Sequence, residues 1–167
     1  MFEIRELKRN DVAAIVATNG GVAWNGGFGK WNQRLAEHEA GKRIVLLAVE
    51  ESSILAYGSL LWSPPYQAFR DLGIPEIQDL VVAQQHRRQG IGGRLIAALE
   101  NLARARGCTQ IGLGVGLYAD YGTAQRLYVK LGYMPDGRGI TYKHLPAKGG
   151  ESFRVDDDLL LWLMKSL

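Results

Sequence analysis

The sequence predicts a mixed α/β protein with a central sheet of about seven strands, mostly antiparallel, and helices on both faces. Short apolar segments with a period of two alternate along the chain with segments whose apolar residues recur every three to four positions. These are the patterns of strands and helices, respectively. The element order that results is β-α-α-β-β-β-α-β-α-β-β. Strands are expected over residues 2–7, 44–49, 54–62, 76–82, 111–117, 133–144 and 158–165.

The N-terminal third shows the boundaries of two helices. After the first strand, Asn10 and Asp11 can cap a helix over about residues 11–18. A second helix is expected over about residues 30–40, and Gly41 ends it because glycine readily takes the left-handed conformation at a helix C-terminus. The second and third strands then follow each other across a four-residue turn, so they are expected to form a hairpin.

A long amphipathic helix follows the fourth strand. Ile91, Leu95, Leu99 and Leu102 recur at helical spacing, and Gly107 ends the helix. This helix is expected to join the fourth and fifth strands as a parallel, right-handed crossover, which makes the sheet mixed. The fifth strand alternates bulky residues with glycine, so one of its faces is apolar and the other is bare backbone.

The last helix is expected over about residues 121–131. It places Ala124, Leu127, Tyr128 and Leu131 on one face. Two further strands complete the predicted sheet.

Composition and charge narrow the class of protein. The 167 residues are expected to form one domain over 1–167, with a net charge of +3 and a pI near 9.1. The charge excess is modest and spread along the chain, which favours a solvated surface over a nucleic-acid interface. No apolar run is long enough for a membrane span and no signal peptide is evident, so a cytoplasmic protein is expected. With Cys108 as the single cysteine and no metal-like spacing, neither a disulfide nor a metal is expected.

Three glycines within four residues open the long helix. Glycine in a helix costs about 1 kcal/mol relative to alanine, so Gly90, Gly92 and Gly93 need an explanation. Uncovered backbone amides at a helix N-terminus bind anions, which the helix dipole also favours. The same field contains three arginines, Arg87, Arg88 and Arg94. The segment therefore predicts a phosphate site, most simply for a pyrophosphate.

Two sequence blocks resemble the GNAT family of acyl-CoA-dependent N-acetyltransferases. The block Arg87-Arg88-Gln89-Gly90-Ile91-Gly92 is similar to that family's signature after its fourth strand, and Ala124 to Tyr133 is similar to its second block. The order of the predicted elements also resembles the family's, which implies an acyl-CoA N-acyltransferase-like fold. One departure is Tyr121, which stands where family members often carry asparagine.

The resemblance implies a site for acetyl-CoA. The pyrophosphate would bind to amides at the start of the long helix, and the pantetheine arm would bind as an added strand to the backbone of the fourth strand. The implied cofactor-binding residues are Leu80, Val81, Val82, Arg87, Arg88, Gln89, Gly90, Ile91, Gly92 and Gly93. The alternatives are a glycine-rich turn without a ligand and a Rossmann-type site, although the glycine spacing is not that of a Rossmann motif.

Two residues are candidates for proton transfer. Tyr128 is the candidate general acid, because a phenol can protonate the CoA thiolate as it leaves; the alternative is a tyrosine that only packs in the core. Glu76 matches the position where several family members place a catalytic glutamate, so it is the candidate general base. Asp79 is the competing carboxylate, and a strand-edge charge or a water relay are further alternatives.

Aromatic residues in two loops are candidates for the acceptor pocket, although any single one of them can instead belong to the core. The candidate substrate-binding residues are Trp24, Phe28, Trp31, Tyr66, Asp79 and Tyr118.

These observations together predict a cytoplasmic N-acetyltransferase that moves acetyl from acetyl-CoA to a primary amine in a ternary complex. A small-molecule acceptor is favoured. The alternatives are a non-catalytic acyl-CoA-binding sensor and an enzyme that acetylates an aminoacyl-tRNA. The strongly apolar run from Leu159 to Met164 is expected to pair within the sheet, and it also raises the prospect of a homodimer.

Overall fold

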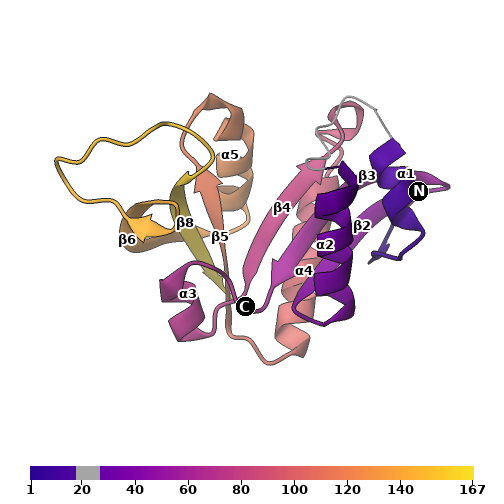
Figure 1. Cartoon of the computed structure of the whole chain (residues 1–167), viewed down its shortest axis with the longest axis horizontal. Coiled ribbons are helices and arrows are strands. Elements are labelled where there is room, and N and C mark those ends of the chain that lie inside the picture. The colour runs from indigo at the N-terminus through magenta and orange to yellow at the C-terminus, as the bar shows by residue number, and fades with distance from the viewer. Residues whose placement is uncertain (18–26) are drawn as a thin grey trace. The chain divides into compact units, whose positions relative to one another are not determined.

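The computed structural model describes residues 1–17 and 27–167, and the chain divides into two compact units. Unit 1 comprises Met1–Leu61 and Ile77–Leu102, and unit 2 comprises Trp62–Glu76 and Ala103–Leu167. The described residues contain eight strands and five α-helices (Figure 1). The predicted fold class, a mixed α/β protein with a mostly antiparallel sheet and flanking helices, is confirmed.

Seven elements of the described residues begin in unit 1. They are β1 (Glu3–Glu6), α1 (Asp11–Ala17), α2 (Gly27–Glu39), β2 (Arg43–Glu50), β3 (Ser53–Leu61), a 3-10 helix (Gln84–His86) and α4 (Ile91–Ala105). Strand β4 (Glu76–Val82) has its first residue in unit 2 and the others in unit 1. The remaining elements, all in unit 2, are α3 (Gln67–Leu72), β5 (Gln110–Gly116), a 3-10 helix (Ala119–Tyr121), α5 (Gly122–Lys130), β6 (Met134–Tyr142), β7 (Leu145–Pro146) and β8 (Leu159–Ser166).

The strands of unit 1 follow the order β1-β2-β3-β4. β2 and β3 form the predicted antiparallel hairpin, with Arg43 opposite Leu61 and Glu50 opposite Ser53. β1 adds to the other edge of β2, also antiparallel. Helices α1 and α2 lie on one side of this sheet and α4 lies on the other (Figure 1).

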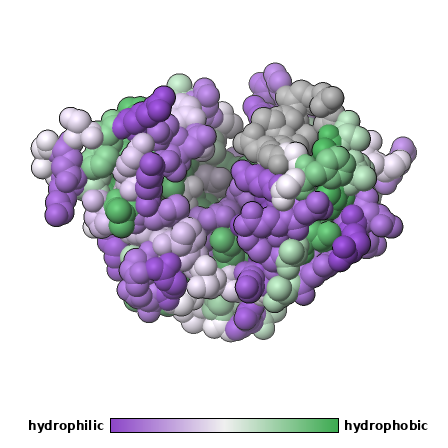
Figure 2. Space-filling model, viewed as in Figure 1, coloured by the Kyte–Doolittle hydropathy of each residue, from purple (hydrophilic) through white to green (hydrophobic). Residues whose placement is uncertain are grey.

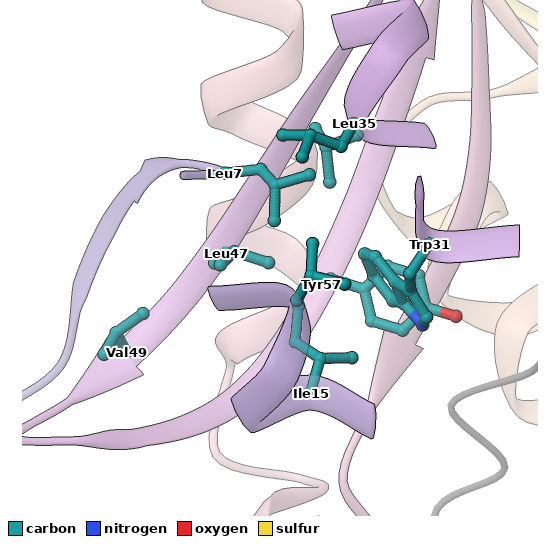
Figure 3. Packing of buried hydrophobic residues seen from close by; sticks show 9 residues of the cluster. Leu7, Ile15, Trp31, Leu35, Leu47, Val49 and Tyr57 are labelled. Atoms are coloured by element: carbon teal, nitrogen blue, oxygen red, sulfur yellow. The ribbon is translucent and has the colours of Figure 1, made fainter. Parts of the chain in front are cut away.

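A hydrophobic core of unit 1 lies under α1 and α2 (Figure 3). The rings of Trp31 and Tyr57 meet edge to face with their centroids 4.9 Å apart. On the other face of β3, Leu80 and Leu99 pack closely on Gly58. An ideal Cβ on Gly58 would lie 3.1 Å from Leu80 Cδ1 and 3.4 Å from Leu99 Cδ1. A glycine at this position therefore lets α4 pack closely on the sheet.

The strands of unit 2 follow the order β5-β8-β6-β7. β5 pairs antiparallel with β8, and β8 pairs antiparallel with β6, whose register is interrupted between Pro135 and Ile140. A second core contains Tyr66, Phe69, Ile74 and Trp162. In this core the Tyr66 ring stacks on Trp162 at 4.1 Å, with the two planes 9° apart.

The alternating glycines of β5 accommodate packed aromatic rings. An ideal Cβ on Gly112 would lie 2.2 Å from Phe69 Cε2, and one on Gly116 would lie 2.4 Å from Tyr121 Cδ2. Large side chains from α3 and from the residues before α5 therefore occupy the space that a side chain on β5 would fill.

Three elements differ from the prediction. Helix α3 lies in a segment that was expected to be a loop, and the two-residue strand β7 was not expected either. Helix α2 begins at Gly27, three residues before its predicted start. α3 has only six residues, too few to show a helical period, although Gly73 ends it with a left-handed φ of 66°. That the chain is one domain stays a prediction.

The face of the molecule seen in the space-filling view is largely hydrophilic, and hydrophobic residues are exposed there in small separate groups (Figure 2). Among the described residues, no helix has both the length and the apolar composition of a membrane span.

The close approach at Gly112 gives a prediction for stability. Gly112→Ala places a methyl group against the Phe69 ring and 3.0 Å from the Leu163 carbonyl oxygen. We expect it to lower the free energy of unfolding by about 1–3 kcal/mol, as overpacking does. The matched control is Gly149→Ala, because a Cβ on Gly149 meets nothing within 4 Å. Urea unfolding of both variants is the measurement, and equal stabilities would contradict the close packing.

Candidate active site

The turn between β4 and α4 is the first part of the candidate site. Ala83 N–H donates to the Leu55 carbonyl oxygen at 2.9 Å, which fixes the end of β4 against β3. The chain then passes through a 3-10 helix and two residues with left-handed backbone, Arg88 (φ 63°) and Gly90 (φ 79°), before α4 begins at Ile91. Glycine takes that conformation without strain, so Gly90 allows the reversal into the helix.

The amides of this turn are available to a ligand. The first backbone bond into α4 runs from Arg94 N–H to the Gly90 carbonyl oxygen, at 3.1 Å. Outside the helices and strands of the described residues, no backbone bond uses the amides from Arg88 to Gly93. The first amides of any helix lack partners within it. The turn therefore presents a series of donors at the positive end of the α4 dipole.

Three arginines of this segment, Arg87, Arg88 and Arg94, have no carboxylate partner among the described residues. Arg87 Nε donates to the Val82 carbonyl oxygen at 3.2 Å, and the Arg94 guanidinium lies over the Phe2 ring at 4.0 Å. Within residues 1–17 and 27–167, none of Arg87, Arg88 and Arg94 forms an ion pair. No carboxylate of the described residues neutralises their positive charge, which suits a polyanionic ligand.

Strand β4 holds a cluster that we call the arginine clamp, made of Asp79, Arg34 and Arg43. Asp79 Oδ2 accepts bonds from Arg34 Nη2 at 3.0 Å and from Arg43 Nη1 at 3.1 Å. The backbone of Asp79 is left-handed, with φ 53°. That conformation costs a non-glycine residue roughly 1–2 kcal/mol, although aspartate tolerates it better than most.

The arginine clamp bears on the two predicted roles of Asp79. This residue was predicted as a competing base and as an acceptor contact, and neither role is tested. Its Oδ2 atom is already shared by two guanidiniums, and the Arg34 side chain is only 3% exposed. The two guanidiniums therefore occupy the Oδ2 atom of Asp79, and both roles of this residue stay predictions. The two arginines escaped the sequence analysis because they are remote from Asp79 in the chain.

Tyr128 lies on the buried face of α5, as the helical spacing predicted. Burial raises the pKa of Tyr128 to about 12, so its phenol is protonated at neutral pH. The hydroxyl makes no hydrogen bond to any residue within 1–17 and 27–167. Its ring meets Tyr133 edge to face, with the centroids 6.2 Å apart. This residue combines a packed ring with a hydroxyl that can donate to a ligand.

Glu76, the other predicted proton-transfer residue, is the first residue of β4, directly after Pro75. Its side chain is buried, being 4% exposed. A carboxylate in a buried position differs from the strand-edge surface charge that was one alternative for this residue.

Two of the predicted acceptor residues are buried in the cores, and their role as acceptor contacts stays a prediction. Trp31 is fully buried against Tyr57, and Tyr66 is stacked on Trp162 with its hydroxyl donating to Asp136 Oδ2 at 2.9 Å. Both rings fill core volume because α2 starts early and the segment after Pro65 forms α3. Phe28 remains exposed near the start of α2. Trp24 lies outside the described residues.

The remaining acceptor candidate, Tyr118, is part of a polar cluster in unit 2. The hydroxyls of Tyr118 and Tyr121 both donate to Asp157 Oδ1, the second at 2.9 Å. The hydrogen bonds from Tyr118 and then Tyr121 hold the pKa of Asp157 below its usual value. The ring of Tyr121, which replaces the family's frequent asparagine, packs on Gly116. Asp157 was not singled out from sequence, because it lies in an acidic run with no motif.

A glycine-rich turn flanked by arginines, set between a strand and a helix of a mixed α/β fold, defines a protein that binds a phosphorylated cofactor. The sequence matches the model of the acetyltransferase (GNAT) family over residues 22–133, and the chain belongs to that family. The predicted family and the predicted enzyme class, an acyltransferase, are thereby confirmed. No curated protein matches the sequence.

Solved structures share this fold over nearly the whole chain. A ribosomal-protein-alanine N-acetyltransferase from Brucella melitensis is 26% identical, with a TM-score of 0.70 and 99% of each chain covered. YncA from Salmonella typhimurium, solved with its cofactor acetyl-CoA, is 22% identical with a TM-score of 0.67, covering 99% of this chain and 94% of its own. PaiA N-acetyltransferase from Thermoplasma acidophilum, in complex with coenzyme A, is 14% identical with a TM-score of 0.69, covering 100% and 99%.

The open backbone at the start of α4 gives a prediction for ligand binding. A Cβ on Gly93 meets nothing within 4 Å, so Gly93→Val can fold while its methyl groups cover the amides. We expect it to weaken binding of adenosine 3′-phosphate 5′-diphosphate at least about tenfold, by displacing the phosphates from the helix N-terminus. The matched control is Ala97→Val, one exposed turn further along α4. Calorimetry compares the two, and equal affinities would place the phosphates elsewhere.

Proposed function

We propose that this chain transfers the acetyl group of acetyl-CoA to a primary amine by direct attack of the amine on the thioester. The proposal rests on the backbone amides from Arg88 to Gly93. In the described part of the chain, none of the backbone hydrogen bonds outside helices and strands uses these amides. Acetyl-CoA supplies an activated acyl carbon and a thiol leaving group. The protein has to hold it, orient it and move two protons.

The turn from Arg87 to Gly93, which we call the phosphate turn, would hold the phosphates of acetyl-CoA by electrostatic attraction. The amides from Arg88 to Gly93 would bind the diphosphate, and Arg87, Arg88 and Arg94 would neutralise the charge that remains. All three guanidiniums lie outside the ion pairs of the described part of the chain, so binding breaks no salt bridge of theirs. Association should therefore weaken with rising salt.

The backbone of β4 would bind the pantetheine arm. Leu80 and Val81 use their side chains for packing: Leu80 lies beside Gly58, and Val81 packs on the core under α1 and α2. Their backbone groups, with those of Val82, can pair with an extended ligand, because side-chain packing and backbone pairing are independent in a strand. An amide near Val82 would also polarise the thioester carbonyl.

Tyr128 would donate a proton to the CoA sulfur as the C–S bond breaks. The phenol fits this role because it is protonated at neutral pH and its hydroxyl has no hydrogen-bond acceptor among the described residues. Glu76 would accept a proton from the attacking amine, which must be neutral to attack although its ordinary pKa is about 10.4. In balance, the ammonium form of the amine gives up two protons: one goes to Glu76 before the neutral amine attacks, and the second leaves the nitrogen to solvent as the new C–N bond replaces the C–S bond. The thiolate that leaves takes the proton of Tyr128.

The acceptor is proposed to be a small amine, contacted by Phe28, Tyr118 and Asp79 and by Trp24. The Brucella neighbour is named for a ribosomal protein's alanine, so a peptide beginning with alanine is the main competing acceptor.

A donor such as acetyl-CoA and a single free cysteine both fit a cytoplasmic setting. The run from Leu159 to Met164 belongs to β8, and a homodimer remains part of the proposal.

The test is a thiol-release assay with acetyl-CoA over a panel of small amines and an alanine-terminated peptide. Release that depends on one acceptor class supports the proposal and names the class. Binding of coenzyme A without release on any acceptor would instead favour a sensor. Absence of coenzyme A binding would overturn the proposal.

Removal of the Tyr128 hydroxyl gives a kinetic prediction. Tyr128→Phe should lower kcat by about 10²–10⁴-fold, the usual contribution of a positioned acid. The affinity for coenzyme A and the melting temperature should stay near those of the wild type, because the ring that packs is retained. Tyr142→Phe is the matched control, since its hydroxyl bonds to Asp156. If both variants retained full turnover, Tyr128 would be a core residue only.

The pH dependence follows from the raised pKa of Tyr128. Its acidic form is complete below the ordinary value of 10 and is lost only as the pH approaches about 12, so the phenol can act as an acid throughout the neutral range. We therefore expect kcat/KM to rise as the amine loses its proton, with no falling limb between about pH 7 and pH 10. A falling limb in that interval, abolished in Tyr128→Phe, would show a far lower pKa than burial gives.

A further inference from the structure

Strand β4 contains one residue in a conformation that a regular strand does not adopt. Asp79 has φ 53°, in the left-handed region, and β4 nevertheless continues through Leu80 and Val81 to Val82. A non-glycine residue stays in that region only where its surroundings hold it there, and such residues cluster at functional sites. Asp79 therefore needs a holding interaction.

The arginine clamp supplies that interaction from two different elements. Arg34 of α2 donates through Nε at 3.2 Å and Nη2 at 3.0 Å, and Arg43 of β2 donates through Nη1 at 3.1 Å, all to Asp79 Oδ2. Neither arginine is free to move. The guanidinium of Arg34 lies 4.8 Å from the Trp31 ring, and Arg43 Nε donates to Glu37 Oε2 at 2.8 Å.

The left-handed residue changes the direction of the strand's side chains. Arg43 Nη2 lies 3.5 Å from Gln78 Oε1 while its Nη1 binds Asp79, so two consecutive residues reach the same guanidinium. Consecutive residues of a regular strand point to opposite faces. After Asp79 the alternation is regular again, with Leu80 beside Gly58 and Val81 on the core under α1 and α2. Asp79 thus sets the orientation of the three residues that follow it.

We propose that Asp79 is a positioning residue for the acylated pantetheine arm of the donor, acting through the backbone of Leu80 to Val82. The arginine clamp holds Asp79 in the left-handed conformation, and that conformation directs the backbone groups with which the arm pairs. This inference rests on the proposed function. It assigns Asp79 a role in donor geometry that is distinct from proton transfer.

Three substitutions separate the conformation from the clamp. Asp79→Ala loses the carboxylate and disfavours the left-handed backbone. Asp79→Gly keeps the backbone accessible but loses the clamp. Asp79→Asn keeps an oxygen for the arginines and a residue type that tolerates this conformation. We expect kcat/KM for acetyl-CoA to fall by about 10²-fold in Asp79→Ala, the loss that follows a misplacement of about 1 Å, less in Asp79→Gly and least in Asp79→Asn.

Two fragments of the donor distinguish positioning from a general loss of structure. Adenosine 3′-phosphate 5′-diphosphate carries the phosphates without the arm, and S-acetylpantetheine carries the arm without the nucleotide. In Asp79→Ala the nucleotide fragment should bind as it does to the wild type, because the phosphate turn is intact. Binding of S-acetylpantetheine, read as its KM or as inhibition, should weaken together with kcat/KM.

The control substitution is Arg9→Ala, which breaks the exposed ion pair with Glu39 on the same unit. It should leave both fragments and the kinetics unchanged. Thermal unfolding of all variants shows which of them are folded. If Asp79→Ala does not fold, the comparison of Asp79→Gly with Asp79→Asn tests the proposal instead.

The outcomes separate this inference from the function on which it rests. Wild-type protein that binds neither coenzyme A nor the nucleotide fragment overturns the proposed function. Wild-type protein that binds and turns over acetyl-CoA, with Asp79 variants that keep full affinity for S-acetylpantetheine or lose both fragments equally, overturns the positioning role alone. A selective loss of the pantetheine fragment, relieved in Asp79→Asn, establishes it.

Discussion

The site depends first on backbone amides at the start of α4 that the protein does not use itself. A helix must leave its first amides without internal partners, and in most proteins a side-chain cap or water satisfies them. In this chain glycines stand where a capping side chain would be, and the segment before them turns through left-handed backbone at Arg88 and Gly90. Arg88 and Gly90 are exposed, so water can satisfy the amides in the unliganded protein, and a bound anion would supply charged acceptors in its place. Three arginines outside any ion pair of the described residues favour such an anion further.

The sequence predicted what depends on local pattern. The β2–β3 hairpin, the long helix α4 and the buried face of α5 were predicted from local patterns, and the structure contains them. The phosphate site was predicted from glycine and arginine within a few residues, and it stays a prediction. α3 was missed because six residues hold too little of a helical repeat. Trp31 and Tyr66 were placed in a pocket because aromatic residues near loops have the same sequence signature whether they line a site or fill a core. In the structure Trp31 packs on Tyr57 and Tyr66 stacks on Trp162, so both rings contribute to a core.

The arginine clamp illustrates a different limit. The sequence from Glu76 to Val82 does not predict the left-handed backbone of Asp79. The arginines that bind Asp79 lie 45 and 36 positions earlier in the chain. A buried ion pair contributes little net stability, since desolvation of the charges offsets much of their attraction. Its value here is conformational. Two guanidiniums on one oxygen restrict where Asp79 can sit, and a strand restricted at one residue transmits that restriction to its neighbours.

Glycine plays two opposite parts in this fold, and the structure separates them. At Gly90 and Gly93 an added Cβ would meet nothing, so the missing side chain leaves the backbone open to an external partner. At Gly112 and Gly116 an added Cβ would collide with Phe69 and Tyr121, so the missing side chain makes room for the protein's own rings. A glycine-rich composition is consequently not evidence for a ligand site by itself. What points to a ligand site is glycine with nothing packed on it, next to amides and cations that have no acceptor and no counter-ion among the described residues. All three conditions meet at the start of α4.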